Sequence, residues 1–205
     1  MNQLKYEIRM LSDWHIGSGL DSATNADSLV KKDDQGHPYI PGKTIKGLIK
    51  DAFQDMVDVG QASEEALVRI FGKPEKDKEA DEVEQQTSHS GNTFFANAKL
   101  PGLEACEIKK NNLSSFLYRN IASTAIDSRG VAKGKSLRVI EVTTPVVLEG
   151  YISPFDGGDL TSDNIDSNFS EADYKLLENA IKLVRRLGVS RNRGLGRCQF
   201  STPKN

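Results

Sequence analysis

Hydrophobic and polar residues alternate along residues 3–11, which is the period of a half-buried β-strand. The apolar face of this strand carries Leu4, Tyr6, Ile8 and Met10. Residues 13–27 are mostly turn formers and small polar residues, so they predict a long loop. A short strand, a DDQG turn and the segment PYIP then predict an irregular hairpin over residues 28–41.

Two longer segments have the hydrophobic period of an amphipathic helix. The first follows residue 41 and ends at Gly60, and its stripe contains Ile45, Leu48, Ile49, Ala52, Phe53, Met56 and Val57. The second begins at Ser170, with Asp173 three positions on as in a capping box, and is stopped by Gly188. Its stripe contains Leu176, Leu177, Ala180, Ile181, Val184 and Leu187. A shorter helix is predicted from Ser63 to about Phe71.

Further strands are predicted at 93–100, 144–152 and 197–201. Residues 121–142 predict a hairpin, with arms at 121–127 and 137–142 around a basic, glycine-containing turn. The order strand, helix, strands, helix, strand predicts an α+β fold, a ferredoxin-like (RRM-like) sheet with insertions. We expect one domain over residues 1–205, with a mobile insertion at 73–92, where the chain is highly charged and poor in apolar residues.

Composition agrees with one globular domain, since 37% of the 205 residues are hydrophobic and 27% are charged. No apolar run approaches the roughly 20 residues of a membrane span, and the N-terminus does not resemble a signal peptide. We therefore expect a cytoplasmic protein without a membrane partner. Cys106 and Cys198 are far apart and lack the spacing of a disulfide framework or a zinc site.

The formal net charge of −2 taken alone argues against a nucleic-acid partner, but the charge is unevenly distributed. Residues 73–84 carry six acidic and three basic side chains, whereas residues 179–205 carry seven basic side chains and no acidic one. Residues 128–140 also hold four basic side chains and no acidic one. Such local basic surfaces attract a phosphate backbone regardless of the average charge.

The loop GVSRNRGLG at 188–196 combines glycines with Arg191 and Arg193, and Arg197 follows it. Glycines allow close backbone approach to a phosphate, and arginine binds a phosphate through two parallel hydrogen bonds. The loop leads from a helix to a strand, the reverse of a dinucleotide fingerprint, which disfavours a nicotinamide-binding fold. The alternative is an ordinary solvated loop.

The start of the first helix, within IPGKTIKGLIK at 40–50, carries Lys43, Lys46 and Lys50 opposite the apolar stripe. Gly47 lies among them, and glycine inside a helix costs about 1 kcal/mol relative to alanine, which indicates close approach of another backbone. These residues predict a phosphate-binding face near the positive end of a helix. The alternative is a solvated lysine face.

Taken together, several segments resemble the RAMP superfamily of CRISPR-associated proteins, and within it the guide-RNA-binding backbone subunit of type III effector complexes. The segments are HIGSG (15–19), DSLVKKDDQGHPYIPGKTIKG (27–47), IFG (70–72), FFANAKL (94–100), TAIDSRGVAKGKSL (124–137) and LGVSRNRGLGR (187–197). The chain departs from the family pattern at Leu29, where a proline is usual, and at Lys43, Thr44 and Lys50.

The resemblance implies a ferredoxin-like palm with a thumb hairpin that wedges between bases of the guide–target duplex. The thumb would be the predicted hairpin, with Arg129, Lys133 and Lys135 contacting RNA. The implied partners are guide RNA, target RNA, further copies of the chain in a filament, and other subunits of the complex. The resemblance also implies a metal-dependent endoribonuclease that cuts target RNA, with Asp27 as the catalytic residue and as a ligand of Mg²⁺ or Mn²⁺.

Three alternatives remain at this point. An aspartate in a polar loop, such as Asp27, is also typical of a turn-capping residue, and Asp21, Asp33 and Asp34 lie nearby in the sequence. If Asp27 only caps a turn, the chain is a non-catalytic or capping subunit. A stand-alone guide-processing ribonuclease would use a histidine; His15 lacks a partner for this and is interpreted as a loop or RNA-contact residue. Trp14 stacks on a base or is structural. A generic RRM is disfavoured because no strand has the RRM aromatic motif.

Overall fold

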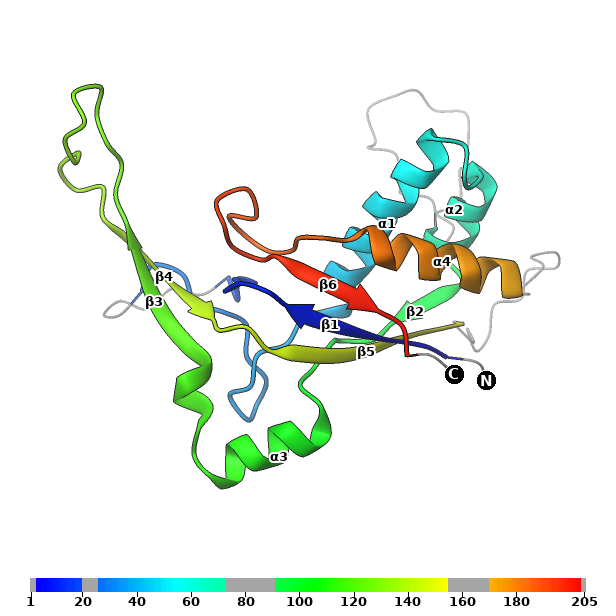
Figure 1. Cartoon of the computed structure of the whole chain (residues 1–205), viewed down its shortest axis with the longest axis horizontal. Coiled ribbons are helices and arrows are strands. Elements are labelled where there is room, and N and C mark those ends of the chain that lie inside the picture. The colour runs from blue at the N-terminus through cyan, green and yellow to red at the C-terminus, as the bar shows by residue number, and fades with distance from the viewer. Residues whose placement is uncertain (1–2, 20–25, 73–90, 155–169, 204–205) are drawn as a thin grey trace, which may run out of the picture.

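The computed structural model describes residues 3–19, 26–72, 91–154 and 170–203 (Figure 1). Its helices and strands, in chain order, are β1 (Leu4–Met10), α1 (Gly42–Asp58), α2 (Glu64–Phe71), β2 (Thr93–Phe95), α3 (Gly102–Lys110), the 3₁₀ helix η1 (Ser114–Leu117), β3 (Tyr118–Ser123), β4 (Arg138–Thr143), β5 (Val147–Pro154), α4 (Glu171–Leu183) and β6 (Cys198–Ser201).

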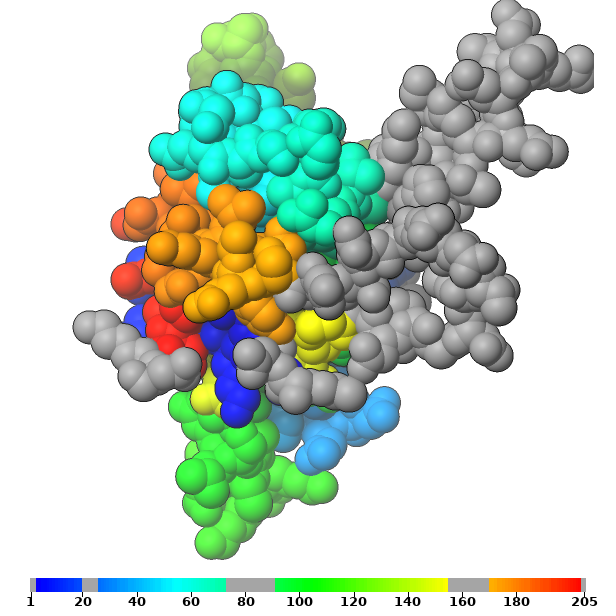
Figure 2. All heavy atoms as spheres, turned by 90° about the vertical axis from the view of Figure 1, so that its right-hand side faces the viewer, coloured from blue at the N-terminus to red at the C-terminus, as the bar shows by residue number. Residues whose placement is uncertain are grey.

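Four strands form one antiparallel sheet in the order β2-β5-β1-β6. When the insertions are set aside, the chain runs β1-α1-β2-β5-α4-β6, which is the ferredoxin-like arrangement that the sequence predicts. The helices α1 and α4 cover one face of the sheet (Figure 1). Viewed from the end of the sheet, α1, α2 and α4 form a continuous layer (Figure 2).

The core lies between the sheet and this helical layer. From β1 it receives Tyr6, Ile8 and Met10, which confirms the predicted alternation. The predicted stripes of the two long helices supply Ile45, Ile49, Phe53, Leu177 and Ile181, all fully buried. The helices begin as expected, since Ser63 caps α2 and Ser170 forms a capping box with Asp173 in α4.

Helix α4 ends at Leu183, earlier than the sequence predicts. The reason lies in the neighbouring chain, because Leu187 N–H donates to Gly196 O (2.9 Å) and Cys198 N–H donates to Arg185 O (3.0 Å). Residues 185–187 are therefore extended against residues 196–198, although the apolar period of the helix continues through them.

A long insertion between β2 and β5 contains α3, η1 and a second sheet of β3 and β4. β3 and β4 pair from Tyr118↔Thr143 to Ser123↔Arg138, and the loop between them extends far from the rest of the molecule (Figure 1). Both predicted arms fall within this hairpin, whereas α3 was not predicted. Residues 73–90 lie outside the described residues, so the mobility of the 73–92 segment stays a prediction.

Among the described residues, no helix is both long and apolar enough to cross a lipid bilayer.

Candidate nucleic-acid interface

Three of the segments selected from the sequence meet at His15, which is 2% exposed. Its Nδ1 lies 2.6 Å from Glu141 O in β4. A carbonyl oxygen only accepts, so Nδ1 carries the hydrogen, and Nε2 lies at hydrogen-bond distance, 3.1 Å, from Ser28 Oγ. The carbonyl oxygen of His15 accepts from Val189 N–H at 2.9 Å. One buried residue therefore joins the loop after Asp27, the hairpin and the glycine-rich loop; we call this the His15 junction.

The predicted RNA contact by His15 does not hold in this arrangement. Both ring nitrogens have protein partners and the ring is buried, so no polar edge of it faces the surface. His15 instead positions the segments that surround it. Trp14 is also structural, since it is 1% exposed and its Nε1 donates to Thr144 O at 3.2 Å.

Asp27 is exposed at the base of the hairpin. Its backbone N–H donates to Val139 O (2.7 Å), and its Oδ2 accepts from Val139 N–H (2.7 Å). The carboxylate thus joins two parts of the chain that are 112 residues apart, which differs from the turn-capping alternative. Asp33 is the residue that caps a turn, because its Oδ1 accepts from the backbone of Gln35 and His37.

A divalent cation at Asp27 would depend on ligands from elsewhere. Among the described residues, no three His, Cys, Asp or Glu side chains are close enough together to hold a metal ion. Mg²⁺ is often bound by one or two carboxylates together with substrate phosphate oxygens and water. A single exposed carboxylate fits that kind of site when RNA is bound. Asp21 lies outside the described residues.

The base of the hairpin is attached to the segment 30–37 by a second polar cluster. Glu141 accepts from Lys32 Nζ (2.8 Å) and from Val30 N–H (3.0 Å), and the Lys32 ammonium lies 3.9 Å from the centroid of the Tyr118 ring. The Tyr118 hydroxyl donates to Gly36 O at 2.6 Å. Burial and the nearby carboxylates raise the pKa of Tyr118, so the hydroxyl keeps its hydrogen. The hairpin is therefore fixed at its base.

The glycines of the loop 188–196 do two different things. Gly188 and Gly196 have positive φ, and a Cβ on either would collide with a backbone carbonyl, that of His15 or of Leu187. These two glycines allow the loop to pack on the protein, and they do not leave its backbone open to phosphate. Gly194, with φ +93° and no atom within 4 Å of an added Cβ, lies in open space.

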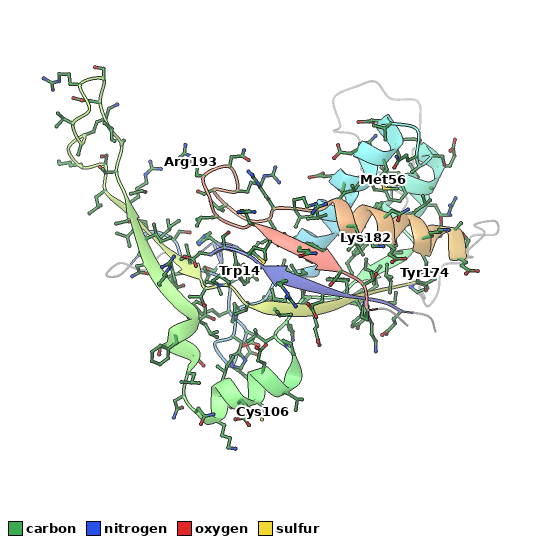
Figure 3. The ribbon with its side chains drawn as sticks, in the orientation of Figure 1. Trp14, Met56, Cys106, Tyr174, Lys182 and Arg193 are labelled. Atoms are coloured by element: carbon green, nitrogen blue, oxygen red, sulfur yellow. The ribbon has the colours of Figure 1, made fainter. Side chains whose placement is uncertain are left out.

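Arg191, Arg193 and Arg197 are all exposed, and none of them has an acidic partner within the part of the chain that the structure describes. Arg193 lies on the outer part of the loop and faces away from the sheet (Figure 3). Arg185 and Arg186 add two exposed guanidinium groups next to it, and Arg186 Nη1 donates to Arg191 O at 3.1 Å. Arg185 and Arg186 are not among the predicted RNA-binding residues, although they belong to the acid-free run 179–205.

The predicted basic residues of the hairpin lie at its exposed end. Arg129 forms an ion pair with Asp127 at 3.1 Å, so part of its charge is neutralised. Hydrogen bonds from the backbone of Val131 and Arg129 lower the pKa of Asp127 and keep it ionised. Lys133 and Lys135 are exposed and have no acidic partner among the described residues.

The lysines of α1 lie elsewhere, beside the edge strand β2. Lys43 and Lys46 line a pocket of about 270 Å³ that contains no residue of the His15 junction. Partial burial and the charge of Lys50 lower the pKa of Lys46. Among the described residues, no atom lies within 4 Å of a Cβ added at Gly47, so no described part of the chain makes the predicted close approach there, and an approach by RNA stays a prediction. It occurs at Gly42, where a Cβ would collide with Phe95 O.

The family model of the RAMP superfamily matches residues 7–199. The structure resembles a chain of type III-B Cmr-beta in its apo state, determined by cryo-EM, with a TM-score of 0.66, 11% sequence identity, and coverage of 99% of this chain and 98% of that chain. It resembles equally a chain of type III-B Cmr-beta bound to cognate target RNA, with a TM-score of 0.66, 11% identity, and coverage of 98% and 97%.

No protein of curated function matches the sequence. The family model, however, spans nearly the whole length of the chain, from within β1 to within β6, and includes the hairpin and the glycine-rich loop. The protein therefore belongs to the RAMP superfamily.

Proposed function

We propose that this chain is the guide-RNA-binding backbone subunit of a type III CRISPR effector complex, and that it cleaves target RNA complementary to the guide. The observation that carries the proposal is the His15 junction, which holds exposed Asp27, the hairpin and the arginine-rich loop together. Membership of the RAMP superfamily and the similarity to chains of type III-B Cmr-beta support it.

Two basic surfaces, one on the loop after α4 and one at the end of the hairpin, suit the guide and its target. The arginines at 185–197 have no acidic neighbours among the described residues and would bind phosphates of the guide. The hairpin end presents Lys133 and Lys135 with exposed apolar side chains, Val131 and Leu137, which suits a contact with bases as well as phosphates. Copies of the chain would follow one another along the guide, with other subunits of the complex, in the cytoplasm.

Asp27 would act on the target strand. Its carboxylate is exposed, and its position is fixed by two hydrogen bonds with Val139. It would orient a ribose 2′-hydroxyl for in-line attack on the adjacent phosphate. A bound Mg²⁺ or Mn²⁺, held by Asp27 together with RNA phosphate oxygens, would supply charge stabilisation. Since the described residues bring no group of three possible metal ligands together, a second candidate is a non-catalytic RNA-binding subunit of the same kind of complex.

Asp27→Asn in the assembled complex tests catalysis. The amide oxygen of asparagine still accepts from Val139 N–H, so the hairpin base is preserved while the negative charge is lost. We expect target cleavage to be abolished, guide binding to be unchanged, and wild-type cleavage to stop with chelator and to leave a cyclic phosphate. Asp33→Ala and Asp34→Ala are the controls. Full cleavage by Asp27→Asn would exclude this residue, and a wild-type complex that binds target with Mg²⁺ or Mn²⁺ but never cuts it would establish the non-catalytic subunit.

Lys46→Glu combined with Arg193→Glu tests RNA binding. We expect weaker binding of unrelated guides alike, with a salt dependence flatter by about one unit of slope per lost phosphate contact. Lys109→Glu with Lys110→Glu, on the exposed side of α3, is the charge-matched control. Wild-type affinity and salt slope in the double variant at 46 and 193 would show that RNA binds elsewhere.

A further inference from the structure

The edge of the sheet at β2 combines a basic pocket with the exposed ring of Phe94 and the half-buried ring of Tyr151. The RNA binding proposed above uses only Lys46 of this group. Lys43 and Lys46 line the pocket together with Phe94, from the edge strand. Phe94 is 45% exposed, and its ring lies 6.2 Å from that of Tyr151 on the adjacent strand β5.

Strand geometry places the aromatic pair on the face of the sheet that α1 and α4 do not cover. Phe95 is buried and stacks on Phe71 of α2 at 5.7 Å, so its side chain points toward the helical layer. Successive side chains of a strand point to opposite faces, so Phe94 points to the open face. RNA recognition motifs, which also have a four-stranded sheet, stack RNA bases on aromatic side chains of the sheet surface.

Basic and acidic side chains lie at different positions along β1 and β5. Lys5 of β1 lies directly opposite Tyr151 of β5. Glu7 of β1 and Glu149 of β5 lie opposite each other, two residues further along the strands and away from the part of β5 that pairs with β2. Glu7 and Glu149, the acidic pair described on these two strands, are therefore displaced from the aromatic pair. A ligand with one anionic group and one flat ring would place the anionic group in the pocket and the ring toward Phe94.

We propose that this edge binds one nucleotide of a single-stranded RNA, with its phosphate on Lys43 and Lys46 and its base against Phe94 and Tyr151. The pocket, at about 270 Å³, is smaller than the roughly 300–1,000 Å³ of sites for drug-sized ligands. The proposal rests on the RNA binding proposed above and adds a contact with a base to it.

Full-length protein and a short fluorescent single-stranded RNA test the proposal. Phe94→Ala should weaken binding by roughly tenfold, since stacking of a base on an aromatic side chain contributes about that much affinity. The salt dependence should not change, because no charge is removed. Phe94→Tyr should restore binding. Leu103→Ala on α3, where the side chain is 87% exposed, is the control and should bind like the wild type.

A second measurement locates the base directly. RNA that contains 4-thiouridine should crosslink, on irradiation, to the peptide with Phe94 or the peptide with Tyr151, and the crosslink should disappear at an excess of unlabelled RNA. Melting temperatures of all variants would be compared, so that loss of binding is separated from loss of folding.

The outcomes distinguish this site from the proposed function. Wild-type affinity in Phe94→Ala, with binding lost in the variant at 46 and 193, would overturn the nucleotide site alone. A wild-type chain that binds no RNA would overturn both proposals. Binding of uridine monophosphate that depends on Phe94, together with RNA binding that does not, would assign the pocket to a free nucleotide and overturn its assignment to RNA.

Discussion

The four-stranded sheet and the β3–β4 hairpin are both antiparallel, yet only the sheet has a core. Tyr6 and Ile8 of β1 are buried under the helices, whereas no residue of β3 is buried and β4 buries only Val142 and Thr143, at the base of the hairpin. The hairpin is held instead at its base, where Glu141 and Asp27 form hydrogen bonds with other segments. A two-stranded hairpin is marginally stable alone. The sheet thus supplies the stability of the protein, and the end of the hairpin is left free for recognition.

The largest effect should come from removing a side chain from the core of the sheet and helices. Phe53 is fully buried in α1 and lies 5.5 Å, edge to face, from Phe71. Phe53→Ala should lower the free energy of unfolding by about 3–5 kcal/mol, from lost burial and the cavity that remains. Urea unfolding measures it, with Val59→Ala, on an exposed side chain, as the control. If Phe53→Ala lowered the free energy of unfolding by less than the hairpin variants do, the assignment of stability to this core would be contradicted.

A smaller effect is expected from the ion pair that joins α2 to α4. Arg69 donates to Asp173, which is 1% exposed, at 2.6 Å. Arg69→Met should cost about 2 kcal/mol at pH 7, as a hydrogen bond to a buried charged group is lost. Arg185→Met, on a guanidinium without an acidic partner among the described residues, is the control. An unchanged free energy of unfolding would show that the capping Ser170 alone satisfies Asp173.

The same pair predicts a pH dependence. Burial tends to raise the pKa of Asp173, but hydrogen bonds from Arg69 and Ser170 outweigh it, and the net pKa is lowered. A lowered pKa in the folded state gives stability that is present above the unfolded pKa of about 3.9 and is lost as the pH falls through the folded value. Arg69→Met should therefore lose less stability than the wild type between pH 7 and strongly acidic pH. Parallel curves for the two proteins would contradict this.

Weakening the contacts at the base of the hairpin should lower the free energy of unfolding by a smaller amount, and the effect should be local. Glu141→Gln keeps the shape of the side chain but removes the charge that Lys32 Nζ and Val30 N–H bind. We expect a loss of about 1 kcal/mol, with faster amide exchange in residues 26–32 and 138–143 and no change in β1 and β5. Hydrogen exchange read by mass spectrometry measures this. Faster exchange throughout the sheet would show that hairpin and sheet unfold as one unit.

A substitution at the end of the hairpin should change the free energy of unfolding least. Val131 is 57% exposed, and Val131→Ala should change the free energy of unfolding by no more than about 0.5 kcal/mol. Thermal unfolding is sensitive enough to compare the variant with the wild type. A loss of 1 kcal/mol or more would mean that the end of the hairpin packs against another part of the chain.

Local features of the chain were determined by the sequence alone. The apolar stripe of α1 and the alternation of β1 follow from spacing, and the capping box of Ser170 follows from residue types three positions apart. The uneven charge of the chain likewise indicated exposed arginines in the loop after α4. Each of these features depends on residues that are close in sequence. The pattern of residue types along the chain is therefore sufficient to predict them.

Only the tertiary structure decided which of the selected polar residues are buried and which meet. The sequence predicts that His15 lies in a loop. Its contacts with Ser28, Glu141 and Val189, which are distant in sequence, place it in the interior. Helix α4 ends before its apolar period does, because residues 185–187 pair with the strand that follows. The pairing of Phe94 with Tyr151 and the lysine pocket beside it also require the strand order of the sheet. Burial and strand pairing depend on long-range contacts, and residue spacing along the chain does not contain them.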